Sequence, residues 1–405
     1  MIPRLAFHQH LTQALLFLNS FLMIAVFRAR TFGTTALDFQ ILLKFGLALF
    51  TIAYALYYFR YWGHRLLKID GVFYIPLILW FFVTCLYAPS PVYSIAAVVS
   101  ILAPTLLLYH AASLLDFKQI LVPLIWACTL ITFISLIVFY VNPSFGASKE
   151  WVDGMRAPSG RISGITGQAN TMGYVTAFAC VIILCYRLYF ASDMPKIYYL
   201  AFALNLTVQI MSNSRTSLIA MILAFGLAFL YKATYTRLAF LFAGICGAIL
   251  FVAFVDIESF LTLFSRSGNI EEITTGTGRT EIWAQVLEKW SERPVFGWGY
   301  GSSGFIMPKF AHATPHAHNF FLQVLFTTGW VGIALLIPLL IVKSYYILKF
   351  QDTFKLTLFV FFIIHGLTEV SAFQGVANCT ALTLSLILAL PYCKGENRSS
   401  QAKRQ

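Results

Sequence analysis

Residues 119–142 read QILVPLIWACTLITFISLIVFYVN and contain no charged side chain. A helix needs about 20 apolar residues to cross the hydrocarbon layer of a bilayer. Inside that layer the backbone polar groups must bond to one another, so only helices and closed barrels span it, and long unbroken apolar runs favour helices. This stretch therefore predicts a transmembrane helix.

The rest of the chain has the same character. Of its 405 residues, 59% are hydrophobic and 11% are charged, and the mean hydropathy is +0.77, outside the range of soluble domains. Apolar stretches of about 17 to 25 residues predict an all-α integral membrane protein with about 12 transmembrane helices. The predicted spans are residues 11–27, 37–59, 72–88, 93–115, 119–142, 167–189, 197–212, 216–232, 237–255, 319–345, 353–372 and 376–392.

The distribution of basic residues predicts the orientation of these spans. With the N-terminus in the cytoplasm, most lysines and arginines, Lys343 and Lys355 among them, fall in cytoplasmic connections, whereas the short outer loops hold only Arg28, Arg30 and Arg215. The positive-inside rule then places both termini in the cytoplasm. The net charge of +12 is accordingly interpreted as anchoring to an anionic lipid leaflet and not as nucleic-acid binding. The seven cysteines form no metal-binding spacing and are interpreted as small apolar fillers.

This threading leaves two long segments on the outer face, residues 143–166 and 256–318, the second between spans nine and ten. Loops beyond about 15 residues are uncommon unless they act as lids or binding segments, so function is expected there. In the second segment, Ile282, Val286 and Leu287 recur at helical spacing and predict an amphipathic helix at the membrane interface, ended by Pro294. The predicted organisation is one polytopic membrane domain over residues 1–393, followed by a polar cytoplasmic tail over residues 394–405.

Residues 294–332 read PVFGWGYGSSGFIMPKFAHATPHAHNFFLQVLFTTGWVG. The chain here resembles the O-antigen ligase and Wzy-type polymerase superfamily, whose members share a periplasmic "R…W……P..G.G" segment and a following "HN-x9-G-x-x-G" helix. GITGQANTMG at residues 164–173 and SNSRTSL at residues 212–218 agree with the same family, so the resemblance covers roughly residues 164–332. The matching elements in this sequence are Arg279, Trp283, Pro294, Gly297, Gly299, His318, Asn319, Gly329 and Gly332.

The resemblance implies a GT-C-like glycosyltransferase of the bacterial inner membrane. Such an enzyme takes a glycan from undecaprenyl diphosphate at the periplasmic face and transfers it en bloc to a sugar hydroxyl. In a ligase the acceptor is the lipid A core, and in a Wzy-type polymerase it is a second lipid-linked glycan that carries a repeat unit of O-antigen or exopolysaccharide. One sequence does not separate the two, although the ligase is slightly favoured. No cofactor is expected.

Three residues are the main candidates for this chemistry. Arginine presents a planar, permanently charged fork that matches phosphate oxygens, so Arg215 and Arg279 are candidates for binding the diphosphate. The acceptor hydroxyl must lose its proton as it attacks, and neutral imidazole is the side chain best matched to that task near neutral pH. His318 is the candidate general base, and one direct displacement predicts inversion at the anomeric carbon. The alternative roles are a headgroup anchor for Arg215, a surface charge for Arg279 and a polar interface residue for His318.

Several other polar residues are candidates for a supporting role. Asn319 is expected to orient His318 or a sugar, and His365 and Glu369 share one helical face near the outer end of the eleventh span. A hydrogen bond between helices is the alternative for that pair. His316 is expected to be structural or exposed, and Arg161 either adds to the phosphate-binding charge or is a solvated loop residue. Gly164, Gly167 and Asn170 predict a tight entry into the sixth span.

A metal site is not expected. His312, His316 and His318 suggest zinc, but no carboxylate or cysteine is close in sequence. Asp256 and Glu258 could together hold a divalent cation, but acidic residues commonly end a span, and two arginines can neutralise a diphosphate without a metal.

Two other classes of function remain. A lipid-linked glycan flippase or transporter would place ionisable residues or broken helices near the bilayer midplane, whereas here the distinctive polar residues cluster at the outer face. A scaffold subunit would predict that glycan transfer survives changes to Arg215, Arg279 or His318.

Overall fold

The computed structural model describes most of the 405 residues of the chain. The described ranges are residues 2–27, 38–66, 69–152, 155–189, 194–230, 279–309, 314–369, 372–373, 375–376 and 378–392. The predicted ninth span (237–255), Asp256, Glu258, His312 and the tail 394–405 lie outside them.

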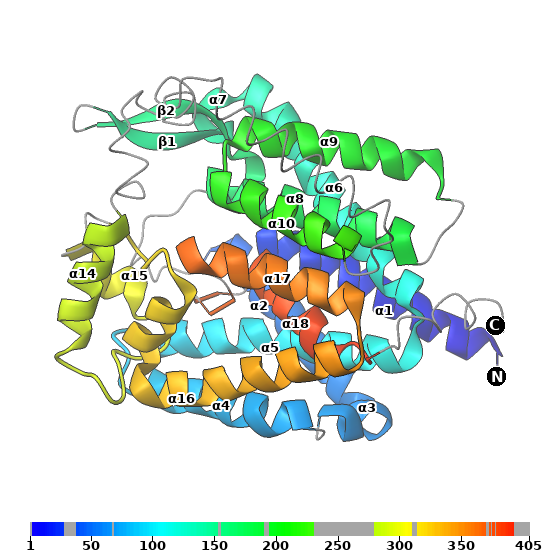
Figure 1. Cartoon of the computed structure of the whole chain (residues 1–405), viewed down its shortest axis with the longest axis horizontal. Helices are drawn as coiled ribbons and strands as arrows, with labels where there is room; N and C mark the ends of the chain where they lie inside the picture. The colour runs from blue at the N-terminus through cyan, green and yellow to red at the C-terminus, as the bar shows by residue number, and fades with distance from the viewer. Residues whose placement is uncertain are drawn as a thin grey trace.

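Long helices account for the bulk of the described chain (Figure 1). Every predicted span except the ninth corresponds to a helix, and the protein is a multi-pass helical membrane protein. The helices at these positions are α1 (Ile2–Ile24), α2 (Phe39–Tyr57), α4 (Ile69–Cys85), α5 (Pro91–Leu114), α6 (Phe117–Val141), α8 (Ala169–Tyr189), α9 (Lys196–Ser212), α10 (Arg215–Leu230), α16 (Phe320–Lys349), α17 (Thr353–Thr368) and α18 (Cys379–Ala389).

Fewer of the described helices reach the length of a membrane span than the sequence predicts. Among the described residues, five helices are long and apolar enough to cross a membrane, or six if the bent pair of α3 (Phe59–Leu66) and α4 forms one span. α17 and α18 are shorter apolar helices. Twelve spans therefore remain a prediction.

Side-chain caps determine where several of these helices begin. Asp116 accepts from the backbone N–H of Gln119, while the Gln119 side chain accepts from the backbone N–H of Asp116, which is a complete capping box for α6. Asn319 caps α16 by accepting from the backbone N–H of Leu322. Asn378 caps α18 by accepting from two backbone N–H groups. Such caps satisfy donors that the first helical turn leaves without partners.

Helices from distant parts of the sequence pack into one bundle. α8 contacts α6, α9 and α10, while α17 contacts α10 and α16, and α16 also packs along α4. α18 is buried over its whole length. By contrast, α2 leaves Leu42, Leu49 and Phe50 exposed, as expected for a helix that faces lipid.

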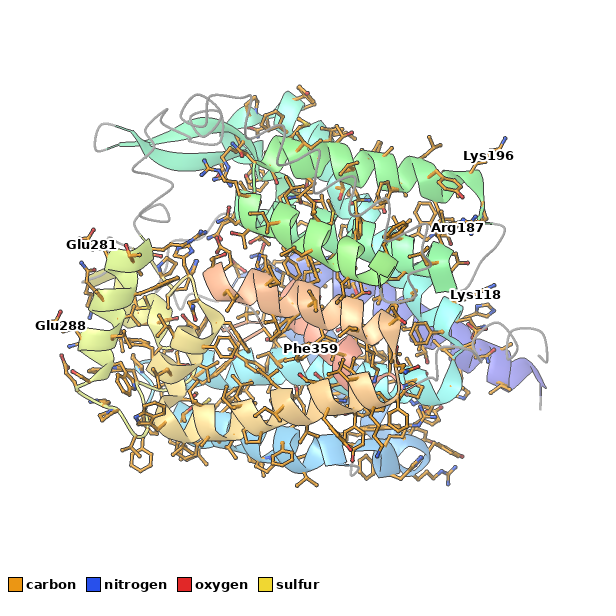
Figure 2. All side chains as sticks on the ribbon, in the orientation of Figure 1. Lys118, Arg187, Lys196, Glu281, Glu288 and Phe359 are labelled. Atoms are coloured by element: carbon orange, nitrogen blue, oxygen red, sulfur yellow. The ribbon has the colours of Figure 1, made fainter. Side chains whose placement is uncertain are left out.

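The two ends of the bundle differ (Figures 1 and 2). One end, called here the basic end, carries the start of α1 and the labelled side chains of Lys118, Arg187 and Lys196. The opposite end, called the site end, carries α14 (Arg279–Trp290) with Glu281 and Glu288, the short α15 (Ser303–Ile306) and the hairpin described next.

The structure agrees with the predicted all-α class, but the segment 143–166 adds a small β-hairpin that the sequence analysis does not predict. After the single turn α7 (Pro143–Gly146), strands β1 (Ala147–Val152) and β2 (Met155–Ile162) pair in antiparallel fashion, and η1 (Gly164–Thr166) leads into α8. A polar segment without a long apolar run can satisfy its backbone groups by pairing with itself, which gives a hairpin. The tight entry to α8 is confirmed, since Gly164 and Gly167 have φ of 50° and 75°.

The predicted helix before Pro294 is confirmed as α14. Its residues Ile282 and Val286 are buried against Met307 of η2 (Met307–Lys309) and Phe326 of α16, while Leu287 is exposed. The helix ends at Trp290, before Pro294 is reached.

A break in α16 holds this outer segment in place. Gly329 adopts φ 66° and ψ −165°, so the helix is interrupted there. The chain from Pro294 to Gly299 lies across the break and exchanges backbone hydrogen bonds with both sides of it, from Trp298 N to Phe326 O (3.0 Å), Gly299 N to Thr327 O (2.8 Å) and Trp330 N to Pro294 O (2.9 Å). Carbonyls that the broken helix leaves without partners are thereby satisfied.

Two buried lysines close the basic end. Lys343 donates to the carbonyl oxygen of Leu388 (3.2 Å) and Lys355 to that of Leu390, both at the C-terminal end of α18. Cations are favourable at that end of a helix because its carbonyls carry partial negative charge. These two residues therefore cap a helix inside the bundle, whereas the sequence suggested solvated loop positions.

Candidate active site

The termini of several helices meet at the site end of the bundle. Asn170 lies in the first turn of α8, Arg279 begins α14, His318 directly precedes the cap of α16, and Glu369 directly follows α17. Helix ends are fixed by the packing of the helices behind them, so these side chains are held by four different helices.

Glu369 is the centre of this arrangement. Its Oε1 accepts from the guanidinium of Arg279 and from Asn170 Nδ2 (2.6 Å), and its Oε2 lies 3.1 Å from His318 Nδ1. Asn170 in turn accepts from Arg161 Nη2 through its Oδ1 (2.7 Å). Glu369 is only 5% exposed, and each of its own three bonds joins residues at least 51 positions apart in sequence.

The surrounding charges decide the protonation state of Glu369. Burial raises the pKa of this carboxyl, but His318, which also hydrogen-bonds to it, and Arg279 outweigh burial and hold its pKa well below the usual range. The group is therefore a carboxylate that can only accept hydrogen bonds.

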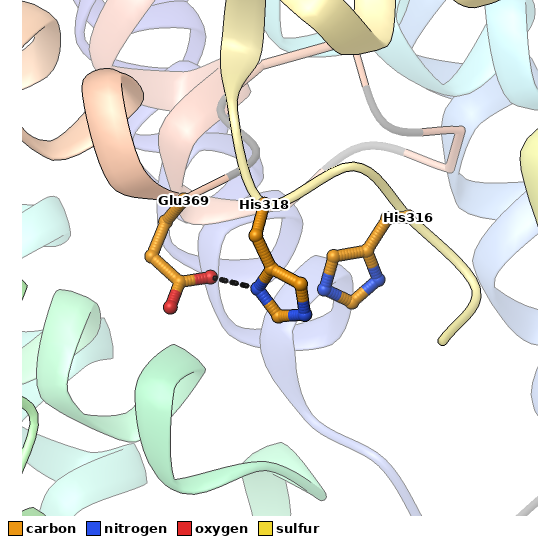
Figure 3. Close-up of side chains that lie close together, drawn as sticks. All are labelled: His316, His318 and Glu369. Atoms are coloured by element: carbon orange, nitrogen blue, oxygen red, sulfur yellow. Dashed lines mark hydrogen bonds and ion pairs between the residues drawn. The ribbon is translucent and has the colours of Figure 1, made fainter. Parts of the chain in front are cut away.

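His318 is oriented by that carboxylate (Figure 3). Because Glu369 only accepts, the hydrogen-bond network assigns the proton to Nδ1 of His318. Nε2 then carries the free lone pair in the neutral ring and lies 3.2 Å from the hydroxyl of Thr314. His318 itself adopts φ 47°, a left-handed conformation that turns the chain sharply before α16.

His316 lies beside His318, with ring centroids 4.3 Å apart (Figure 3). Burial, with help from the neighbouring His318, lowers the pKa of His316 to about 3, so this ring is neutral at physiological pH. Of the two interpretations predicted for His316, structural or exposed, the structure excludes the second, since only 6% of the residue is accessible.

The fold places more potential metal ligands together here than the sequence indicates. The sequence showed no carboxylate near the histidines, yet the fold brings Glu369 to His316 and His318, with one ligand atom of each lying within 4.8 Å of the others. Both Glu369 oxygens already accept bonds, one of them from the cationic Arg279, which disfavours a second cation at the same carboxylate. That no metal is needed remains a prediction.

The arginines predicted to bind diphosphate lie at the same end of the bundle. Arg279 uses one terminal nitrogen on Glu369, and a guanidinium has further N–H donors to offer. Arg215 is the first residue of α10, and the adjacent Thr216 hydroxyl lies 3.0 Å from that of Thr368, which directly precedes Glu369. Arg161 also donates to the backbone carbonyl of Ser212 (2.9 Å), so it connects the start of α8 to the end of α9.

The remaining supporting candidates have structural contacts. Asn319, besides capping α16, donates to the carbonyl of Leu367 (2.9 Å) and so ties α16 to α17 next to Glu369. His365 is buried one turn before Glu369, with its ring edge-on to Tyr174 at 4.4 Å. Asn170 was predicted only as a turn residue and Thr314 was not singled out, because contacts between side chains this far apart leave no local signal in the sequence.

A polar pocket adjoins this cluster. Its cavity volume is about 30 Å³, which is room for about one or two water molecules, and it is lined among others by Asn170, His316, His365 and Glu369. The site thus combines an oriented histidine, a carboxylate and arginines beside a small cavity.

Comparison with known proteins finds similarity over the region that contains the motif residues. Residues 200–337 match the family model described as O-antigen ligase. The chain is also 26% identical over 230 residues to a curated protein from Acinetobacter baylyi named ComP-specific O-oligosaccharyltransferase. That alignment covers 52% of this chain and 41% of the relative, so the chain matches less than half of the relative's length. The matched region contains Arg279, His318 and the motif glycines, and over residues 200–337 the chain is therefore similar to the O-antigen ligase family.

Proposed function

We propose that this protein transfers a glycan en bloc from a lipid diphosphate to the hydroxyl of an acceptor, with His318 as general base. The observation that carries the proposal is the geometry of His318: Nδ1 faces the Glu369 carboxylate at 3.1 Å, and Nε2 faces a hydroxyl at 3.2 Å. A base needs hydrogen-bond reach to the proton that it takes and a partner that fixes its tautomer.

The reaction follows from these positions. The acceptor hydroxyl takes the place of the Thr314 hydroxyl at Nε2, and its proton moves to that nitrogen as its oxygen attacks the anomeric carbon. The bond from that carbon to the phosphate oxygen breaks, and the electron pair leaves with the diphosphate. Glu369 stabilises the imidazolium that forms, as a buried carboxylate does in other histidine-dependent enzymes. One displacement inverts the configuration at the anomeric carbon.

The donor is proposed to be an undecaprenyl-diphosphate-linked glycan. Negative charge grows on the diphosphate as it leaves, and Arg279 and Arg215 at the same end of the bundle supply charge of the opposite sign. A lipid tail suits a site at the end of apolar helices, since the tail can stay in the bilayer. No metal is required in this scheme because the arginines neutralise the leaving group.

The proposed acceptor is a sugar hydroxyl of the lipid A core, and a second lipid-linked glycan would make the enzyme a Wzy-type polymerase. The name of the Acinetobacter relative gives a specific reason to test a third acceptor, a hydroxyl on a protein. A flippase is less well supported, because the polar cluster lies at the helix ends and not along the middle of the bundle.

The proposed setting is the bacterial inner membrane, with the site end in the periplasm and both termini in the cytoplasm. The basic side chains of Lys118, Arg187 and Lys196 at the end opposite the site support this orientation.

The test is a reconstituted transfer assay with purified protein. Wild type, His318→Ala and the control His64→Ala, which alters an exposed histidine of α3, are each given undecaprenyl-diphosphate glycan and one of the three acceptors, with and without EDTA. Transfer by wild type and His64→Ala, a loss of at least 100-fold in His318→Ala and no effect of EDTA are expected. Full transfer by His318→Ala would sink the assignment of the base, and the acceptor that is used distinguishes ligase, polymerase and protein glycosylation.

A further inference from the structure

A group of exposed apolar side chains lies where the segment 294–299 crosses the break in α16. Its members, called here the apolar patch, are Leu86, Val295, Phe296 and Trp330, which are 77%, 48%, 57% and 54% exposed. Contiguous exposed apolar side chains mark surfaces that meet a partner or a membrane. The surroundings of the patch decide which of the two it meets.

Firm contacts hold the patch in place. Val331 N donates to the carbonyl oxygen of Val295 (3.3 Å), and the Tyr87 hydroxyl donates to that of Phe296 (2.7 Å). The Phe296 ring also packs against that of Trp80 on α4, with centroids 5.8 Å apart. The exposed side chains of Val295 and Phe296 therefore project from a backbone that is fixed between α4 and α16.

The apolar patch continues a surface that faces lipid. Beyond Trp330, one face of α16 carries exposed apolar side chains at helical spacing. They are Ile337, Ile341, Tyr345 and Leu348. α4 packs along α16 (Figure 1), and its exposed residues Leu79 and Val83 lead to Leu86, just after the helix. The patch is thus the limit, at the site end, of one apolar surface shared by two helices, and in a membrane protein such a surface is covered by lipid.

The length of α16 places the edge of the hydrocarbon layer at the patch. From Trp330, after the break, to Lys349 the helix has about 20 residues, which at 1.5 Å per residue is about 30 Å. The hydrocarbon core of a bilayer is about 30 Å thick. Tryptophan and lysine, the residues at the two limits, both favour the interface between hydrocarbon and water. The break at Gly329 therefore coincides with the membrane surface at the site end.

The residues next to the patch have the composition of the interfacial layer. The Trp298 ring has two cations beside it, with the guanidinium of Arg293 4.3 Å and Lys289 Nζ 4.9 Å from its centroid. The Trp290 ring meets that of Trp330 edge-on, with centroids 5.6 Å apart. Aromatic rings with one polar edge and long basic side chains suit the zone where hydrocarbon gives way to lipid headgroups. Arg293 is exposed, and a guanidinium matches the phosphate of a headgroup.

We infer that the apolar patch inserts into the lipid leaflet on the side of the site end, with Arg293 at the level of the headgroups. The sequence predicts α14 itself at the interface, but α14 buries Ile282 and Val286 against protein, so the residues that follow it make the contact with lipid. The leaflet then holds the C-terminal end of α14, while Arg279 at its other end bonds to Glu369. The inference concerns the position of the bilayer and stands whichever reaction the site carries out.

The test measures depth in the bilayer with spin labels on single introduced cysteines. The full chain is reconstituted at a low protein-to-lipid ratio into phosphatidylethanolamine–phosphatidylglycerol vesicles. Collisions of each label with oxygen are compared with collisions with a water-soluble nickel chelate that is present on both sides. Phe296→Cys and Arg293→Cys probe the proposed anchor. The reference positions, both exposed, are Ile341→Cys, about midway along α16 after its break, and Glu288→Cys on α14. The unaltered chain, labelled in parallel, gives the background from its own cysteines.

Insertion predicts that the ratio of oxygen collisions to nickel collisions falls in the order Ile341→Cys, Phe296→Cys, Arg293→Cys and Glu288→Cys. Because oxygen enters hydrocarbon and the polar chelate does not, the ratio at Phe296→Cys should exceed that at Glu288→Cys at least about threefold. Equal ratios at these two positions would overturn the inference by placing the patch in water. Exclusion of both reagents from the label at Phe296→Cys would overturn it as well, since protein and not lipid would then cover the patch.

Discussion

At the scale of single residues, Glu369 organises the site by joining groups that the sequence keeps apart. It bonds to Asn170, 199 positions away, to Arg279, and to His318. A carboxylate that holds a histidine in one tautomer and stabilises its protonated form is typical of sites in which the histidine moves protons.

Replacing Glu369 by glutamine should therefore slow transfer without preventing the donor from binding. The neutral amide neither fixes the Nδ1 proton nor stabilises the imidazolium, so kcat should fall about 100-fold or more, with the donor KM changed less than threefold. Glu288→Gln, an exposed position on α14, is the control. A Glu369→Gln enzyme with wild-type kcat would show that the carboxylate has no part in orienting the base.

His316 gives a pH dependence of stability whose sign can be worked out. Its pKa is lowered in the folded protein from 6.5 to about 3, so between these values the unfolded chain binds a proton that the folded chain does not. Stability is therefore lost as pH falls from about 6.5 towards 3, by about 2 kcal/mol at pH 5 for this group. In thermal unfolding of the purified protein in detergent, His316→Gln should lose less stability than wild type between pH 7 and pH 5. Parallel pH profiles of the two proteins would contradict this.

The sequence identifies some of these residues as candidates but not the hydrogen bonds that join them. His318 and Arg279 stand in recognisable motifs, and the fold brings both to the same carboxylate. From the sequence alone, Glu369 either supports the site or forms a hydrogen bond between helices. Asn170 is predicted only as part of a tight turn. Pairing across 199 residues depends on how α8 packs against α17, which no local pattern encodes. For the same reason, the sequence gives no sign that a carboxylate lies beside the histidines in the fold.

At the scale of elements, the glycines of the motif serve packing. A Cβ on Gly297 would lie 2.6 Å from the backbone of Thr327, Thr328 and Gly329, and one on Gly329 would lie 2.2 Å from the carbonyl oxygen of Val295. The motif thus contains two kinds of residue, with His318 and Arg279 at the site and the glycines where two backbones touch.

Gly329→Ala should destabilise the outer segment. Its φ and ψ are strongly disfavoured for residues with a side chain, and the contact with Val295 leaves no room for a methyl group, so a loss of about 3 kcal/mol or more is expected. Hydrogen exchange should accelerate at the amides of Trp298 and Gly299, which bond across the break. Gly226→Ala is the control, because a Cβ there meets nothing within 4 Å. Unchanged exchange in Gly329→Ala would mean that the segment does not depend on this contact.

The sequence predicts helices correctly wherever a single pattern, either a long apolar run or a helical spacing of apolar residues, dominates. Continuous apolar runs located the helices, and the spacing of Ile282 and Val286 located α14. The β1–β2 hairpin was missed because a short polar segment carries no strong periodicity, and its form is decided by pairing with itself.

At the scale of the whole molecule, the basic end and the site end should lie on opposite sides of the membrane. Arg187→Cys and Glu288→Cys introduce thiols at exposed positions near the two ends. In intact cells with a permeable outer membrane, an impermeant maleimide should label Glu288→Cys at once and Arg187→Cys only after lysis, with the parent chain as background. The cysteines described by the structure are buried, which keeps that background low. Labelling of both variants from the same side would exclude the proposed orientation.

The positive-inside pattern predicts the orientation from basic residues of which only some lie at the helix ends in the fold. Lys118, Arg187 and Lys196 do gather at one end. Lys343 and Lys355, counted as loop charges, instead cap α18 inside the bundle. A charge count does not distinguish a lysine in water from one that binds helix carbonyls.

The contact between residues 294–299 and the break in α16 also bears on how such proteins diverge. Because that contact is made by main-chain atoms, the exposed side chains at Val295 and Phe296 can change over time, whereas Gly297 and Gly329 cannot. Distant relatives would then still share a recognisable glycine signature after their glycans and acceptors had become different. Such a signature records how the outer segment is attached to the bundle, and it is a poor guide to which sugar a given relative transfers.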